Sequence, residues 1–285
     1  MRVVSLLPAA TEIVAALGAG GQLVGVSHEC DFPPSVRALP RVTRTTLDPA
    51  LPPGAIDRAM AEAASSGASP VEVDVNLVAH LRPDLVIGQS VCDVCAVGEG
   101  QLAHLVGTLM PTPWVVTLHA HTLDEVLADV GKVGEALELR DEAEELVAGL
   151  RYRLRRVSNR VPRAGVRPRV LVMEWLDPPY VAGHWVPELV ALAGGQDIGS
   201  AAGERSRARS WDELAALGAD LVVVALCGFD ESRARSELAA ASGGAARALL
   251  DASRRVEVID GNAYTSRPGP RLADAAEILS RLIVG

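Results

Sequence analysis

The sequence predicts an α/β protein of two similar lobes with parallel sheets, joined by a single long helix. Short β-branched runs alternate with longer amphipathic stretches along the chain, which is the pattern of parallel strands covered by helices. Residues 83–87 and 219–223 share one pattern, in which a helix ends and a buried strand begins. A long amphipathic segment separates the two halves. Together these observations favour two lobes over one large domain.

The elements follow from hydrophobic period and from turn residues. The predicted strands are residues 3–7, 23–26, 85–87, 114–117, 169–173, 221–225 and 256–259. The predicted helices are residues 11–17, 73–80, 100–108, 186–193 and 211–216. The glycine-rich residues 18–21 end a helix and precede a strand, whereas a dinucleotide-binding loop must follow a strand. We therefore interpret them as a helix C-terminus.

The segment between the lobes carries two helix starts. Thr122 and Glu125 have capping-box spacing, and Asp141 is the expected cap of the next helix, which runs to about Asn159. At 1.5 Å per residue this second helix spans roughly 28 Å, enough to cross a lobe boundary. We predict an N-terminal lobe of residues 1–139, an interdomain helix of residues 140–160 and a C-terminal lobe of residues 161–285.

Composition excludes two classes of partner. The chain is 49% hydrophobic, 22% charged and carries a net charge of -9, and this acidic balance argues against nucleic acid, whose phosphates require clustered Lys and Arg. No apolar run approaches the roughly 20 residues that a membrane span needs. The expected partner is a small molecule.

Candidate ligand-binding residues collect in the loops that follow the strands, where open parallel sheets bind ligands. Aromatic residues are only 3% of the chain, yet most fall in or beside these loops, which suits a large, flat, partly apolar ligand. For any one of them, packing that holds the loop against the protein is an equally expected role. The candidates are Pro8, Thr11, His28, Phe32, Glu174, Trp175, Tyr180, His184, Trp185, Phe229, Tyr264 and Arg267. Thr11 is also the expected N-cap of the first helix.

The four cysteines also fall in predicted loops. Cys92 and Cys95 have the spacing of a metal-binding pair, and His28 and Cys30 offer two further soft donors. Inert buried thiols and a structural disulfide are the alternatives. His119 and His121 are left out of the predicted site, because a lone histidine is more often a hydrogen-bonded structural residue.

The order and spacing of several segments resemble the class III periplasmic binding proteins that serve ABC importers, and most closely the cobalamin-binding branch. These segments are residues 3–12, 81–87, 178–183, 192–195 and 266–271. The resemblance implies two Rossmann-like lobes, a rigid connecting helix, a ligand cleft between the lobes and no catalysed reaction. Cobalamin is then the expected ligand, with no cofactor required.

The resemblance also implies individual roles. Tyr180 matches a ligand-facing aromatic residue and Arg267 a polar ligand contact, with Tyr264 beside it. Glu99 and either Asp212 or Glu213 match acidic residues that dock on an ABC permease, for which a solvated surface charge is the alternative. Gln89 departs from the pattern, since some cobalamin binders carry a tryptophan there.

Location and function leave alternatives open. The chain begins without a recognisable signal peptide, so we expect a cytoplasmic protein if the sequence is complete, and a periplasmic or lipid-anchored one if a signal was trimmed. One alternative function is a metalloprotein or corrinoid-processing enzyme that uses Cys30, Cys92 and Cys95. Another is binding of haem or a ferric siderophore. No set of nucleophile, base and orienting residue is visible.

Overall fold

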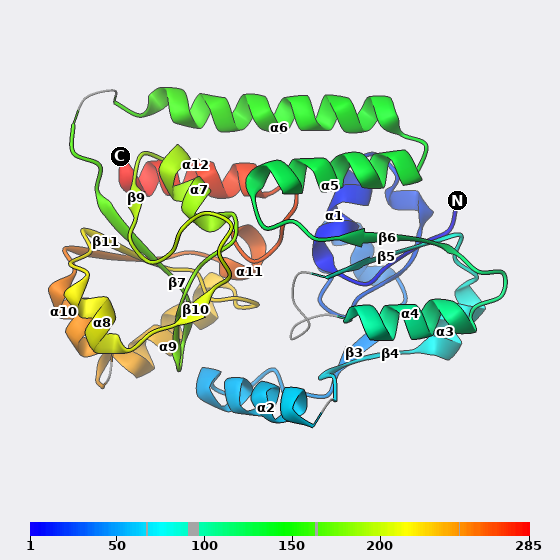
Figure 1. Ribbon diagram of the computed structural model, residues 1–285, viewed down its shortest axis with the longest axis horizontal. Coiled ribbons are helices and arrows are strands. Elements are labelled where there is room, and N and C mark those ends of the chain that lie inside the picture. The colour runs from blue at the N-terminus through cyan, green and yellow to red at the C-terminus, as the bar shows by residue number, and fades with distance from the viewer. Residues whose placement is uncertain (67, 91–96, 163–164, 245) are drawn as a thin grey trace. The chain divides into compact units, whose positions relative to one another are not determined.

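The computed structural model describes residues 1–66, 68–90, 97–162, 165–244 and 246–285. The chain forms two compact units, each with its own sheet (Figure 1). The first unit comprises Met1–Leu51, Arg58–Ala120 and Asp124–Ala148; the second comprises Pro52–Asp57, His121–Leu123 and Gly149–Gly285. The predicted two-lobed α/β class is confirmed. The second unit also takes in two short segments from the part of the chain predicted as the N-terminal lobe.

The main sheet of the first unit has four parallel strands in the order β2-β1-β5-β6. Their bounds are Val3–Ser5 (β1), Leu23–Val26 (β2), Leu85–Gln89 (β5) and Trp114–Leu118 (β6). Because β1 pairs with β2 on one side and β5 on the other, the strand order reverses at β1. In open α/β sheets such a reversal marks the place where ligands bind. The short strands β3 (Thr43–Thr45) and β4 (Val71–Val73) form a separate antiparallel pair, which the sequence did not predict.

Helices cover both faces of this sheet (Figure 1). Val3 and Ile87 pack with helix α1 and helix α5 on one face, while Val4 and Val86 pack with α3 and α4 on the other. This alternation follows from the two-residue period of a strand. The helices are α1 (Pro8–Ala16), α3 (Val75–Leu81), α4 (Glu99–Thr108) and α5 (Leu123–Ala136), with short 3₁₀ turns η1 (Gly20–Gln22) and η2 (Pro34–Ala38).

Helix α1 begins at Pro8, three residues before the predicted start. Proline suits the first helical position, because its fixed φ is that of a helix and its missing N–H is not needed there. The expectation that Thr11 caps this helix is therefore wrong. At the other end Gly18 has a φ of +78°, which confirms the interpretation of residues 18–21 as a helix C-terminus.

The sheet of the second unit runs in the order β10-β8-β7-β11-β12, with β9 beside the start of β7. Strands β7, β11 and β12 are parallel, as predicted, whereas β8 and β10 extend the edge in antiparallel fashion. The bounds are Arg169–Leu176 (β7), Pro179–Val181 (β8), Gln196–Asp197 (β9), Arg207–Ala208 (β10), Leu221–Val224 (β11) and Arg255–Val258 (β12).

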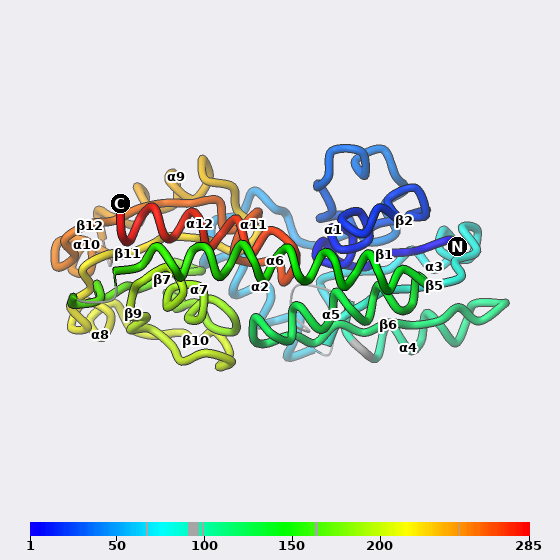
Figure 2. Tube along the Cα trace, turned by 90° about the horizontal axis from the view of Figure 1, so that it is seen from above, coloured from blue at the N-terminus to red at the C-terminus, as the bar shows by residue number. Residues whose placement is uncertain are grey.

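Helices α8, α9 and α10 pack on one face of this sheet through Leu214, Ala234 and Leu249. Helices α7 and α12 cover the other face, and the second half of α6 lies alongside α12 (Figures 1 and 2). Arg153 of α6 binds both Asp274 and Glu277 of α12. The bounds are α7 (Val186–Leu192), α8 (Trp211–Ala216), α9 (Glu231–Ser242), α10 (Arg247–Ala252), α11 (Gly261–Tyr264) and α12 (Leu272–Ile283).

Three helices contain a boundary between the units. Helix α2 (Pro53–Ser65) contains the one that follows Asp57, α5 the one that follows its first residue, Leu123, and α6 (Arg140–Arg160) the one between Ala148 and Gly149. Asp141 lies inside the first turn of α6 rather than at its cap, where its charge still favours the positive end of the helix dipole. Within the described residues, no helix has both the length and the apolarity to cross a membrane.

Candidate ligand-binding site

In the first unit, the carboxyl end of β1 leads into a buried network of hydroxyl and thiol groups. Thr11 is fully buried, and its Oγ1 donates to Ser5 Oγ at 2.8 Å. Cys30 Sγ lies 3.1 Å from Thr11 Oγ1, and Ser5 Oγ donates to the carbonyl oxygen of Leu7. These contacts hold the β1–α1 turn in place. Thr11 is thus engaged in the interior, while Pro8 is half-buried at the helix start.

The loop after β2 is held by Thr43 and Arg41. Thr43 Oγ1 accepts from the backbone N–H of His28 at 2.9 Å and lies 2.7 Å from His28 Nδ1. Arg41 donates to the carbonyl oxygens of Ser27 and Cys30. Burial lowers the pKa of His28 below its ordinary value, and the charge of Arg41 lowers it further. His28 is therefore a neutral hydrogen-bonding group at neutral pH.

The remaining predicted residues of the first unit are spread out. Phe32 follows the same loop and is 42% exposed. Cys92 and Cys95 lie outside the described residues, and for Glu99 the structure gives only its position as the first residue of α4. Among the described residues, no three His, Cys, Asp or Glu side chains are arranged to hold a metal ion. The metal site at His28, Cys30, Cys92 and Cys95 stays a prediction.

In the second unit, three predicted aromatic residues come together at the carboxyl ends of β7 and β11. Trp175 and Tyr180 are direct partners across β7 and β8, and the Trp175 ring lies 5.1 Å from that of Phe229 at an angle of 53°. We call Trp175, Tyr180 and Phe229 the aromatic cluster. The Arg233 guanidinium lies 3.6 Å from the centre of the Phe229 ring, a cation–π contact. Arg233 was not predicted, although its place on the next helix, four residues after Phe229, was a usable sequence signal.

Two carboxylates face the aromatic cluster. Burial raises the pKa of Tyr180 above its ordinary value, and the negative charges of Asp57 and then Glu174 raise it further. Tyr180 is therefore an uncharged phenol whose O–H is available as a donor. Glu174 was predicted. Asp57 was not, because it comes from the short segment Pro52–Asp57 more than a hundred residues away in the chain.

The loop after β12 joins this region through backbone and side-chain contacts. The Asn262 N–H donates to the carbonyl oxygen of Phe229 at 3.1 Å, and Arg267 Nη2 donates to Asn262 Oδ1 at 2.9 Å. Asp260 caps α11 by accepting from the Ala263 N–H at 2.7 Å. Arg267, only 5% exposed, is thus oriented by Asn262. Tyr264, which lies on α11, is half-buried.

Trp185 holds this loop through a hydrogen bond to its backbone. It is 5% exposed, and its Nε1 donates to the carbonyl oxygen of Thr265 at 2.9 Å. Its neighbour His184 has a φ of 54°, and His184 Nδ1 lies 2.9 Å from His121 Nδ1. The ring centres are 5.0 Å apart, so the two nitrogens point toward each other as in an N–H···N hydrogen bond. The sequence prediction left His121 out as a hydrogen-bonded structural residue; its partner His184 lies 63 residues away in the chain.

The histidine pair predicts a loss of stability in acid. Burial lowers the pKa of His184 from 6.5 to about 4, with further lowering by His121 and Arg205. The unfolded chain therefore binds this proton more tightly than the folded chain, so stability falls as the pH drops from about 6.5 toward 4. Because His184 is only half-buried, we expect a loss of about 1–2 kcal/mol rather than the full value of the shift.

The check is urea unfolding at neutral and acidic pH for His184→Asn, since asparagine tolerates positive φ and does not titrate. His184→Asn should lose less stability in acid than the unmodified chain. His80→Asn, at an exposed position on α3, is the matched control and should lose as much as the unmodified chain. If His184→Asn lost as much stability in acid as the unmodified chain, the histidine pair would not be the cause of the acid sensitivity.

Asp212 and Glu213 lie in the first turn of α8. Glu213 completes a capping box with Ser210, accepting from the Ser210 N–H at 2.8 Å, and the Glu213 N–H donates back to Ser210 Oγ. The Ser210 N–H and the Ser210 hydroxyl, which both donate to Glu213 Oε2, lower the pKa of Glu213. Glu213 therefore has a role in starting the helix, whereas Asp212 is exposed. Docking by either residue stays a prediction.

Solved structures of low sequence identity share the fold. A periplasmic heme binding protein from Pseudomonas aeruginosa superposes with a TM-score of 0.75 at 24% identity, covering 99% of this chain and 92% of that one. The periplasmic vitamin B12 binding protein of Vibrio cholerae gives a TM-score of 0.71 at 21% identity, covering 99% and 96%. These likenesses show a common architecture.

Sequence comparison gives a relative and a family. The vitamin B12-binding protein of Vibrio cholerae serotype O1 is 24% identical over 201 residues, which cover 69% of this chain and 60% of the relative. The chain therefore spans less than two thirds of the length of the curated relatives it matches. A family model described as periplasmic binding protein matches residues 3–244. Because that match covers most of the chain, in both units, the protein belongs to the periplasmic binding protein family.

Proposed function

We propose that this chain binds a cobalamin-type corrinoid and that Trp175 and Tyr180 of the aromatic cluster contact its ring system, while Phe229, only 5% exposed, supports Trp175 from the core. The observation that carries the proposal is the meeting of Trp175, Tyr180 and Phe229 at the carboxyl ends of β7 and β11. Aromatic side chains give a flat, partly apolar ligand a large contact area at little cost in conformational entropy. The sequence relative named as a vitamin B12-binding protein supports this choice of ligand.

The polar groups around the cluster suit a corrinoid as well. A corrin ring carries amide side chains that both donate and accept hydrogen bonds. The Tyr180 O–H and Arg267 would supply donors, and the Glu174 carboxylate an acceptor. Delivery of the ligand to an ABC permease is part of the same proposal, with Glu99, Asp212 and Glu213 as the docking residues. A cytoplasmic location is the alternative prediction, and in that case the chain would bind the corrinoid without serving a permease.

Titration of the chain with cyanocobalamin, cobinamide and hemin tests the ligand. We expect a change in the cobalamin absorbance spectrum and a rise in melting temperature with the two corrinoids. A response to hemin alone would replace the corrinoid by haem as the ligand. No response to any of the three would overturn the proposal.

A tryptophan substitution tests the site. Trp175→Ala should weaken corrinoid binding about tenfold or more, because loss of one well-packed aromatic contact costs on the order of 1.4–3 kcal/mol. Trp175→Phe, which keeps a ring, should weaken it less. Trp114→Ala is the matched control, since it removes the same kind of side chain from a position 70% exposed on β6. Equal affinity of Trp175→Ala and Trp114→Ala would remove the aromatic cluster from the site.

A further inference from the structure

Strand β6 forms an edge of the main sheet of the first unit, and among the described strands it pairs with β5 alone. The Trp114 N–H donates to the carbonyl oxygen of Asp84, and the Leu118 carbonyl oxygen accepts from the chain just beyond β5. Because the backbone groups of successive strand residues point to opposite sides, the N–H and C=O groups of Val115 and Thr117 face away from β5. The outer side of β6 thus presents donors and acceptors to which a further strand can bind.

The side chains along this edge are exposed and uncharged. Trp114 is 70% exposed and Val115 41% exposed, and Met110, in the loop that leads into β6, is 88% exposed. Residues 100–123 contain no Asp, Glu, Lys or Arg, although these four types make up 22% of the chain. In Figure 1 the strand runs between α5 above it and α4 below it. We call the outer side of β6, with the side chains of Trp114 and Val115, the β6 edge.

The opposite edge of the same sheet is covered. The chain that follows β2 runs alongside it, so that the Val26 N–H donates to the Pro40 carbonyl oxygen at 3.0 Å and the Val42 N–H to the Val26 carbonyl oxygen at 2.9 Å. In the small sheet of β3 and β4, Arg44 and Glu72 lie directly opposite each other and form an ion pair at 2.6 Å. Cover and charged side chains are two means by which proteins prevent edge-to-edge association.

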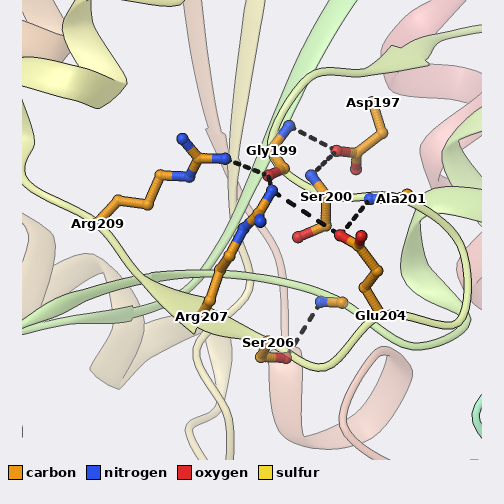
Figure 3. A network of polar contacts seen from close by, with 9 residues as sticks. Asp197, Gly199, Ser200, Ala201, Glu204, Ser206, Arg207 and Arg209 are labelled. Carbon is orange, nitrogen blue, oxygen red and sulfur yellow. Dashed lines mark hydrogen bonds and ion pairs between the residues drawn. The ribbon is translucent and has the colours of Figure 1, made fainter.

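Charge and short length protect the edges of the sheet in the second unit. At one edge β12 carries Arg255 and Glu257. At the other edge β10 is two residues long, and Arg207 within it and Arg209 just after it both donate to the Gly199 carbonyl oxygen, at 3.2 and 3.3 Å (Figure 3). The β6 edge has five residues, no charged side chain and no described strand beside it other than β5. Of the described sheet edges it is therefore the one best suited to pair with another strand.

We propose that β6 pairs in antiparallel fashion with β6 of a second copy of this chain. A two-fold axis at Val116 places Val115 opposite Thr117 of the second copy, so that the outward N–H and C=O groups of both residues are paired in both copies. On one face of the joined sheets Trp114 then lies opposite Leu118 of the second copy, and Val116 lies opposite its own equivalent. Aromatic and β-branched pairs of this kind stabilise neighbouring strands.

Charge favours a second copy at this surface and no other described edge. Two chains that each carry a net charge of -9 repel each other, so they associate most readily through a surface without charged groups. Symmetry supplies the complement, because the strand that presents free donors and acceptors also provides the matching ones. A peptide of another protein would have to bring its own uncharged strand.

The contact area predicts a weak dimer. The exposed parts of the two Trp114 rings amount to roughly 200–350 Å², and with the paired backbone, Val115 and Met110 the buried surface reaches roughly 1,000 Å² in total. This area is near the lower end for specific interfaces between proteins. We therefore expect a dimer with a Kd of about 1–100 μM.

Sedimentation velocity on the unmodified chain tests the association. Between about 1 and 300 μM the average mass should rise from that of one chain, 29.8 kDa, toward twice that value. A single chain at every concentration would overturn the proposal. Neither outcome depends on the corrinoid, because the measurement is made without ligand.

A charged substitution tests the surface. Val115→Lys introduces at the β6 edge the residue that sheets most often use against edge pairing, and it should weaken the dimer at least about tenfold. Val166→Lys is the matched control, since it makes the same change at a valine that is 97% exposed elsewhere, and it should dimerise like the unmodified chain. Equal dimerisation of Val115→Lys and Val166→Lys would overturn the role of the β6 edge.

Amide hydrogen exchange followed by NMR tests the pairing itself. As the concentration rises, exchange of the Val115 and Thr117 amides should slow, whereas the Trp114 amide, which already donates to Asp84, should change little. In Val115→Lys this dependence on concentration should be lost for the Thr117 amide. A dimer that protects amides elsewhere but leaves β6 unchanged would contradict strand pairing at this edge.

Discussion

Replacement of Trp185 by alanine is expected to lower the free energy of unfolding by about 3–5 kcal/mol, the usual cost of removing a large buried aromatic side chain. Trp185 is 5% exposed, and its Nε1 holds the carbonyl oxygen of Thr265. Loss of the indole leaves a cavity and also a half-buried loop without its donor. Urea unfolding followed by circular dichroism measures the change.

Two variants separate these causes. Trp185→Phe keeps much of the volume but removes the donor, so it should cost about 1–3 kcal/mol, less than alanine. Trp114→Ala removes a tryptophan that is 70% exposed and should change stability by no more than about 0.5 kcal/mol. Similar losses for Trp185→Ala and Trp114→Ala would mean that Trp185 does not fasten the loop.

The second large loss of stability is expected on substitution of Gly261, the first residue of α11. A Cβ added there would lie closer than 3.0 Å to backbone atoms of Ala225 and Leu226, just beyond β11. Backbone cannot move aside as a side chain can, so Gly261→Ala should cost about 3 kcal/mol, at or above the usual range for overpacking. It should also displace Asn262 and Arg267 and so weaken corrinoid binding.

Gly149→Ala is the matched control for Gly261→Ala. Gly149 lies within α6, and a Cβ there meets nothing within 4 Å. Alanine is the better helix former, so this variant should be more stable by about 0.4–1 kcal/mol. Chemical denaturation of the two variants side by side provides the measurement. A Gly261→Ala variant as stable as the parent would contradict the close approach of α11 to β11.

The sequence predicted the central strands well, because a fully buried parallel strand is a short β-branched run bounded by turn residues. Residues 23–26 and 211–216 form a strand and a helix with the predicted bounds. The short strands β3, β4, β8, β9 and β10 escaped prediction, since two or three residues carry no readable period. Helix α1 starts at Pro8 rather than Thr11, because proline suits the first helical position and the helix already contains Thr11.

The candidate site was predictable only in part. Aromatic residues in loops after parallel strands could be named from sequence, and three of them form the aromatic cluster. The sequence could not show which of these aromatic residues support the fold instead, since the burial of Trp185 depends on a partner 80 residues away. Asp57 was missed for the same reason, because tertiary folding alone brings it to Tyr180.

The second unit is assembled from pieces that are far apart in the chain. Its segment Pro52–Asp57 supplies Ile56 to the core and Asp57 to Tyr180, and the Leu123 N–H binds Glu188. During synthesis, which proceeds from the N-terminus, both segments leave the ribosome before the sheet that receives them exists. The nascent first unit must therefore carry these segments undocked until the last strands have been made, and a polypeptide that starts at residue 161 would lack them.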